Sequence, residues 1–262
     1  MRSSNPVMNS LTNSESTNPY AVNTAGMGLD STERPITVDD VVTKTGITLG
    51  VIVLGAVVNF FIATAVNPGL AMMLTLVGAL GGLITVLVAS FGKKWGSATV
   101  TLIYAAFEGL FVGGFSFMFT NVTVSGASAA SMIGQAVLGT IGVFLGMLFV
   151  YKTGAVRVTP KFTKILTAAM IGVLVLALGN FLLAIFTGMS PLRDGGALAI
   201  VFSLVCIVLG ALSFLADFDQ ADHLIRTGAP AGHAWGVALG LAVTLVWLYT
   251  EILRLLSYFQ NR

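Results

Sequence analysis

Seven stretches of about twenty apolar residues, separated by short polar segments, fill the sequence from residue 45 to residue 257. A hydrocarbon core about 30 Å thick needs about 20 residues of helix to cross it, because each residue advances the helix by about 1.5 Å. The sequence therefore predicts an all-α polytopic membrane protein that folds as a seven-transmembrane-helix bundle. The predicted spans are residues 45–66, 69–91, 98–119, 130–151, 163–187, 195–216 and 235–257.

The composition agrees with a membrane protein and limits the partners. Hydrophobic residues make up 56% of the chain and charged residues 9%, a balance that water-soluble domains do not use. The formal net charge of +2 is too small to indicate a nucleic-acid partner. The expected partners are the lipid bilayer, ions and other membrane proteins. The one cysteine, Cys206, can form neither a disulfide nor a thiolate metal site within the chain.

The N-terminal segment is polar and rich in Ser, Asn and Thr, so residues 1–36 are predicted to be a disordered tail and residues 37–262 the membrane domain. The tail has no apolar stretch behind a basic start, so a cleaved signal peptide is not expected. Thr37, Asp39 and Asp40 provide N-cap oxygens and negative charge for free backbone N–H groups, which predicts a helix start near Thr37.

The distribution of Lys and Arg predicts the orientation, because cytoplasmic loops retain these residues. The N-terminus is predicted to be cytoplasmic and the C-terminus, after seven crossings, outside. The predicted cytoplasmic side has Arg2, Arg34, Lys44, Lys93, Lys94, Lys152, Arg157, Lys161, Lys164 and Arg226, whereas the other side has only Arg193, Arg254 and Arg262.

Glycines recur at four-residue spacing within several spans, which lets helix backbones approach closely in lipid. Packing within one bundle is the favoured interpretation, with dimerisation as the alternative. The pairs are Gly46 and Gly50, Gly78 and Gly82, Gly109 and Gly113, Gly142 and Gly146, and Gly236 and Gly240.

Ionisable residues inside the spans are the candidates for function, because a charge at the bilayer centre costs about 3 kcal/mol or more. Glu108 is the eleventh of 22 residues in its predicted span, close to the centre. It is predicted to lie on an ion pathway, although a protonated glutamic acid bonded to a neighbouring helix is the alternative. Glu251 and Arg254 share one face of the last span; they either serve an ion pathway or neutralise each other.

Three carboxylates, Asp217, Asp219 and Asp222, follow the sixth predicted span. They crowd the negative end of the helix dipole and repel one another, which favours proton uptake or binding of a hard cation by oxygen ligands. A solvated helix end is the alternative. His223 and His233 flank the same loop and could add pH sensitivity.

Several enzymatic chemistries lack their residues. The sequence contains no Gly-x-Ser-x-Gly motif, no His-Glu-x-x-His zinc motif and no phosphate-binding glycine loop with lysine. The last predicted span has no lysine that could form a retinal Schiff base. We therefore expect the protein not to be an enzyme and to have no cofactor.

Four segments follow one another in an informative order: Thr37-Val-Asp-Asp-Val-Val-Thr-Lys-Thr45, Glu108-Gly109, Asp217-Phe-Asp-Gln220 and Trp247-Leu-Tyr-Thr-Glu-Ile-Leu-Arg-Leu-Leu256. Together they resemble the Bax inhibitor-1 family, in its bacterial branch, over residues 37–257. The resemblance implies a bundle around a central helix, located in the plasma membrane. It also implies a pH-sensitive calcium leak channel.

In that family, a carboxylate at the end of the sixth helix and another in the seventh form a proton-sensitive latch. The resemblance places the first on Asp217 or Asp219. The second falls on Thr244, which cannot ionise, and Glu251 lies seven residues further on. Because that separation is about 10 Å along a helix, a direct bond between Asp219 and Glu251 is not expected.

Two functions from different classes follow. The first is passive calcium permeation, gated by protonation at Asp217 and Asp219, with Glu108 and Glu251 as deeper acidic stations. The alternative is a non-conducting regulator that binds a membrane protease or another membrane protein through the tail and the basic segment from Lys152 to Lys164. A proton-coupled transporter is not favoured, because the sequence shows neither repeats nor broken spans.

Overall fold

The computed structural model describes residues 34–92, 95–120 and 129–260. The chain has two units, residues 1–34 and 35–262, and every described helix lies in the second. Residues 1–33 of the predicted disordered tail lie outside the described residues. Arg2, Lys93, Lys94 and Arg262, which support the predicted orientation, also lie outside them. Ile36, which the prediction also assigns to the tail, is buried and hydrogen-bonded to the Ala229 carbonyl.

Seven helices of the described chain are long and apolar enough to cross a membrane, which confirms the predicted seven-helix bundle. The first span combines α2 with a short π-helix, η1. The elements are α2 (Val38–Phe61), η1 (Ile62–Val66), α3 (Pro68–Phe91), α4 (Ala98–Met118), α5 (Ala129–Thr153), α6 (Pro160–Thr187), α7 (Ala197–Arg226) and α8 (His233–Gln260).

The start of the first helix is determined by its capping residues. The Thr37 hydroxyl accepts a hydrogen bond from the Asp40 backbone N–H, and the Asp40 carboxylate accepts one from the Thr37 backbone N–H. This capping box satisfies two otherwise free donors. It confirms the predicted start near Thr37.

The sixth predicted span ended too early. The α7 helix continues to Arg226, ten residues beyond the predicted end at Ala216. Its last three turns contain neither Gly nor Pro, and the chain turns only at Gly228, which has a positive φ of 66°. The three aspartates are therefore helical residues that face different sides of α7.

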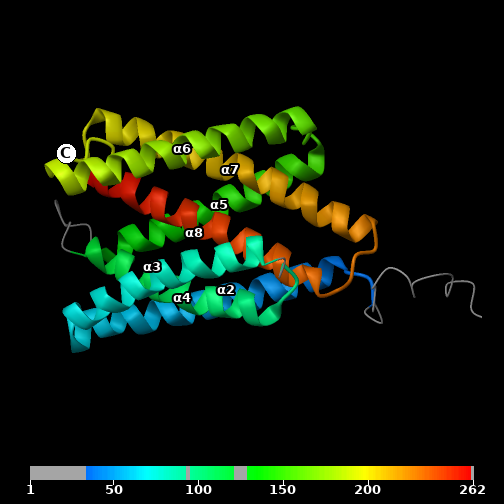
Figure 1. Cartoon of the computed structure of the whole chain (residues 1–262), viewed down its shortest axis with the longest axis horizontal. Helices are drawn as coiled ribbons and strands as arrows, with labels where there is room; N and C mark the ends of the chain where they lie inside the picture. Colours follow the sequence, from blue (N-terminus) through cyan, green and yellow to red (C-terminus); the bar gives the residue numbers. More distant parts are fainter. Residues whose placement is uncertain (1–33, 93–94, 121–128, 261–262) are drawn as a thin grey trace, which may run out of the picture. The chain divides into compact units, whose positions relative to one another are not determined.

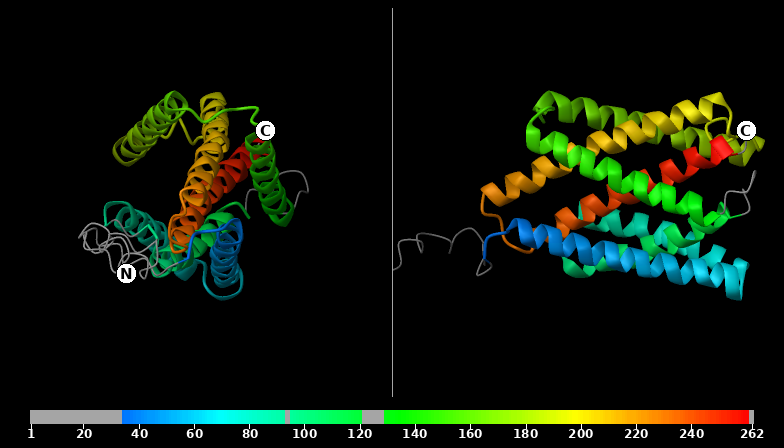
Figure 2. Two further views of the ribbon diagram at one scale, coloured as in Figure 1. Left: turned by 90° about the vertical axis from the view of Figure 1, so that its right-hand side faces the viewer. Right: turned by 180° about the vertical axis from the view of Figure 1, so that it is seen from behind.

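The last helix is the central one (Figure 1). It packs against α2, α4, α5 and α7, while α3 packs on α4 and α6 on α7. The end-on view in Figure 2 shows α8 between α2, α3 and α4 on one side and α5, α6 and α7 on the other. The central helix implied by the family resemblance is therefore α8.

Apolar side chains surround α8 in three clusters. The first includes Ile52 and Leu239, the second Phe214 and Leu241, and the third Met132 and Leu253. Since a helix with apolar residues on all sides is typical of a buried core element, the polar residues of α8 stand out against this background.

Close helix packing uses only some of the predicted glycine pairs. A Cβ atom added to Gly113 would collide with the Ala56 backbone, and one added to Gly109 would lie 2.6 Å from the Ile52 carbonyl oxygen. These contacts bring α4 against α2. In contrast, the pairs Gly46 and Gly50, and Gly142 and Gly146, face open space, so the prediction that they pack within the bundle is wrong.

The loop between α7 and α8 is held by α2 and the residues before it. The Ile36 N–H donates to the Ala229 carbonyl at 2.8 Å, and the Lys44 ammonium donates to the Ala231 carbonyl at 2.6 Å. Lys44 also lies 5.7 Å from the centre of the Trp235 ring. These contacts fix the positions of the α7 end and the α8 start.

Candidate functional site

The predicted sixth-helix and seventh-helix positions meet between α7 and α8. The Thr244 hydroxyl donates a 2.8 Å hydrogen bond to Asp217 Oδ2, and it also lies 3.2 Å from the Gly240 carbonyl oxygen. Thr244 is buried and Asp217 is half-buried. The structure thus brings Asp217, rather than Asp219, to Thr244. We call Asp217 and Thr244 the latch pair.

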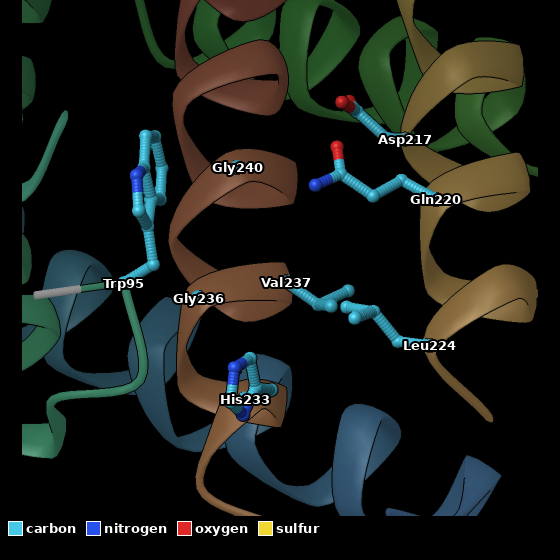
Figure 3. Close-up of a pocket in the computed structure, with 8 residues that line it drawn as sticks. All are labelled: Trp95, Asp217, Gln220, Leu224, His233, Gly236, Val237 and Gly240. Carbon is cyan, nitrogen blue, oxygen red and sulfur yellow. The ribbon is translucent and has the colours of Figure 1, made fainter. Parts of the chain in front are cut away.

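The Asp217 carboxylate also lines a pocket of about 420 Å³. Figure 3 shows Asp217 and Gln220 pointing from α7 towards α8, with Trp95 on the other side of the α8 ribbon. Gly236 and Gly240 of α8 have no side chains that would fill the pocket. The lining residues are Trp95, Asp217, Gln220, Leu224, His233, Gly236, Val237 and Gly240.

The charge of Asp217 has no ionic partner within the described part of the chain. There, no Lys, Arg or His nitrogen lies within 4.0 Å of its carboxylate. Its one described hydrogen bond comes from a neutral hydroxyl. A half-buried carboxylate of this kind remains available to a proton or a cation.

The other two aspartates lie apart from the latch pair. Asp219 is exposed. Asp222 forms a 2.7 Å ion pair with Arg226 and accepts a 3.3 Å hydrogen bond from the Tyr151 hydroxyl. No group of three His, Cys, Asp or Glu side chains in the described residues is arranged to hold a metal ion. The structure therefore does not gather the three predicted metal ligands, because α7 continues as a helix and separates them.

Glu251 lies near the other end of the α7–α8 contact, between two arginines. Its Oε1 atom is 2.6 Å from an Arg254 nitrogen and 3.3 Å from an Arg193 nitrogen. The Glu251 side chain is only 4% exposed. The predicted pairing with Arg254 is therefore present, and Arg193 joins it from the loop between α6 and α7. We call Arg193, Glu251 and Arg254 the arginine cluster.

Both arginines of this cluster also lie over aromatic rings. The Arg193 guanidinium is 5.6 Å from the centre of the Phe202 ring, and that of Arg254 is 5.5 Å from the Phe115 ring. Such cation–π contacts stabilise a charge that has left bulk water. The cluster has one more positive than negative charge.

Glu108 lies half-buried between α3 and α4. A Cβ atom added to Gly82 would lie 2.7 Å from a Glu108 carboxylate oxygen, so the carboxylate fills the space that this glycine leaves. Tyr104, one turn earlier on α4, is its neighbour there. Glu108 thus faces a helix contact and is not one of the residues that line the pocket.

Sequence reasoning missed Arg193, Trp95 and Gln220 as site residues. Arg193 had a usable signal, because it is the single basic residue in the predicted outer loops and is followed directly by Asp194. Its partner Glu251 is 58 positions away, and no local pattern indicates that contact.

These observations define a multi-pass membrane protein with a latch pair and an arginine cluster on its central helix. The chain matches the family described as Bax inhibitor 1 like over residues 5–261. It therefore belongs to that family, as the resemblance predicted. A search of curated proteins gave no match.

Proposed function

We propose that this protein is a passive calcium leak pathway of the plasma membrane, controlled by protonation of Asp217. The observation that supports it is the latch pair itself, a carboxylate that lines a pocket and is held across two helices by one neutral hydroxyl. Calcium prefers carboxylate and carbonyl oxygens. The pocket offers the Asp217 carboxylate and the Gln220 amide.

Protonation would act on the contact between α7 and α8. Deprotonated Asp217 accepts a charge-assisted hydrogen bond from Thr244, and such bonds are about twice as strong as neutral ones. A proton on Asp217 removes that advantage, so the contact loosens as the pH falls. His233 is the other residue with an ionisable side chain that lines the pocket, and it is exposed. We therefore expect the leak to increase with acidification.

In this proposal, a calcium ion passes two further carboxylates deeper in the bundle, those of Glu108 and Glu251. Glu108 offers a carboxylate near the middle of α4, and Glu251 offers one near the end of the α7–α8 contact. Arg193 and Arg254 neutralise Glu251, so its service as a station requires a change in that ion pair.

Calcium flux into proteoliposomes across a series of pH values tests the proposal. We expect a leak that increases as the pH falls and that loses its pH dependence in Asp217→Asn. Ser213→Ala is the matched control, because Ser213 is also on α7 but donates to the Leu209 carbonyl of its own helix and to the Met170 sulfur of α6, not to α8. No calcium entry at any pH would contradict a leak pathway.

A non-conducting regulator is the second candidate, and one surface supports it. The end of α5, the start of α6 and the connection between them present four exposed basic side chains: Lys152, Arg157, Lys161 and Lys164. None of these four forms an ion pair within the described residues. A protein that lacks flux in liposomes, but loses its effect in cells when residues 1–34 are deleted, would be a regulator.

A further inference from the structure

Three buried oxygen atoms in and beside the arginine cluster have no hydrogen-bond partner among the described residues. They are Glu251 Oε2, Ser203 Oγ and the Tyr258 hydroxyl. The Ser203 hydroxyl lies within side-chain hydrogen-bonding range of Glu251 but forms no well-aligned bond with it, and Tyr258 lies close enough for the charge of Glu251 to act on its hydroxyl. Buried polar atoms normally have partners, so a free carboxylate oxygen with two unpartnered hydroxyls near it indicates a place where a ligand can bind.

The charge next to these atoms comes from two different kinds of element. Arg254 is on α8 itself, three residues from Glu251, and moves with it. Arg193 comes from the loop between α6 and α7, is 31% exposed and reaches the same Oε1 atom at a longer distance. Of the two guanidiniums, Arg193 is therefore the more loosely held.

We propose that Glu251 Oε2, Ser203 and Tyr258 form a second cation site and that Arg193, which bonds to the Oε1 atom of the same carboxylate, blocks this site as a tethered cation. This proposal rests on the proposed leak function and deepens it, because it assigns control of the far end of the α7–α8 contact to a loop residue. While Arg193 is bound, the cluster has a net positive charge and repels cations. When Arg193 withdraws, one carboxylate and two hydroxyls face a hard cation.

The remaining charges fit a site for passage rather than storage. Without Arg193, the charges of Glu251 and Arg254 cancel, so a cation meets a neutral set of oxygen ligands. Conduction requires binding that is favourable enough for entry and weak enough for release. A fully acidic cage, in contrast, would hold calcium.

The Cys206 thiol can report whether this site is open. Cys206 is the one cysteine of the chain, is buried on α7 and lies close enough for both Glu251 and Arg193 to act on its thiol. A thiol reagent can therefore detect an opened site without any flux measurement. The cationic, membrane-impermeant methanethiosulfonate reagent MTSET is a suitable probe, since it must enter a cation path.

The test compares Cys206 labelling by MTSET in the wild type and in Arg193→Gln, in the full-length protein reconstituted in nanodiscs. We expect labelling to be severalfold faster in Arg193→Gln and to slow again when millimolar Ca²⁺ is added. Arg193→Lys keeps a cation and should stay close to the wild-type rate. Asp194→Asn is the matched loop control, because Asp194 is exposed and caps the Gly196 N–H.

Two results would overturn the proposal. One is wild-type labelling in Arg193→Gln, provided that the thermal unfolding of this variant shows an intact fold. The other is faster labelling that Ca²⁺ does not slow, which would mean an opening without a cation site. Ser203→Ala in the Arg193→Gln background should weaken the protection by Ca²⁺. Absence of flux in liposomes would refute the leak function separately, because the labelling does not depend on it.

Discussion

Two carboxylates lie between α7 and α8, and their surroundings differ. Asp217 lies beside a pocket and accepts a hydrogen bond from the neutral Thr244 hydroxyl. Glu251 is 4% exposed and is held by two guanidiniums. A charged group out of water needs a compensating charge or a proton. Glu251 has compensating charges from two arginines, whereas Asp217 has no ionic partner among the described residues.

We call the Asp217 end of the α7–α8 contact the responsive end and the Glu251 end the neutralised end. Asp217 can change its proton occupancy without leaving another charge unpaired, so it suits a switch. Glu251 cannot lose its charge without leaving Arg193 and Arg254 uncompensated, so it suits a fixed part of the bundle that opens only when Arg193 moves. In the proposed function, this helix pair therefore combines a proton-sensitive contact with an electrostatic barrier.

The largest expected effect comes from removing the acid of the arginine cluster. Glu251→Gln keeps the shape of the side chain but leaves two guanidiniums without a counter-charge in a largely buried place. Breaking one partner out of a buried ion pair costs about 3 kcal/mol or more. Thermal or denaturant unfolding in detergent micelles should show this loss.

The matched variant at the other end is Asp217→Asn, in which the hydrogen bond from the Thr244 hydroxyl loses its charge assistance. We expect it to cost about 1 kcal/mol. Equal losses of stability in the two variants would contradict the distinction between a neutralised and a responsive end.

The second prediction concerns pH and the latch pair. Thr244→Val keeps the volume and removes the donor, so the leak should be severalfold higher than wild type at neutral pH and nearly independent of pH. Asp217→Asn should behave in the same way, because its side chain is permanently neutral. The readout is calcium entry into liposomes over a pH series.

The direction of the effect distinguishes two roles for Asp217. If Asp217→Asn instead lowers the leak at every pH, its carboxylate acts as a calcium ligand and not as a latch. If the variant keeps the wild-type pH profile, protonation acts at another residue.

The fold was predictable because its signals are local. Continuous apolar stretches specify seven spans, and Thr37 with Asp40 specifies the first helix start. The end of α7 was misjudged because hydropathy locates the membrane boundary and not the helix boundary. A polar segment without Gly or Pro continues as a helix outside the apolar region.

The site was predictable only in part. The family resemblance pointed to Thr244 and left Asp217 and Asp219 open, and the register between α7 and α8 is what selects Asp217. Arg193 was beyond prediction as a partner of Glu251, because their contact depends on how the α6–α7 loop folds back on α8. Contacts between distant segments are the part that composition and spacing do not encode.

The third prediction concerns Glu108, which belongs to neither end. Glu108→Gln retains the shape that fills the space at Gly82 and removes the charge near the middle of α4. We expect a moderate decrease of the calcium leak, by about half to severalfold, with an unchanged pH profile, because the latch pair stays intact. An unchanged leak would remove Glu108 from the ion pathway and leave it as a packing residue.

The smallest effect is expected at Asp222, which tests whether the acidic end of α7 acts as one group. Asp222 is partly exposed and pairs with the exposed Arg226 one turn later. Surface pairs of this kind contribute about 0.5 kcal/mol or less, so Asp222→Asn should hardly change the unfolding temperature. Because Asp222 is not among the residues that line the pocket, calcium flux and its pH dependence should also stay at wild-type values. A large loss of flux in this variant would show that Asp217, Asp219 and Asp222 cooperate in binding calcium. Asp217 would then no longer differ in function from the other two aspartates of α7.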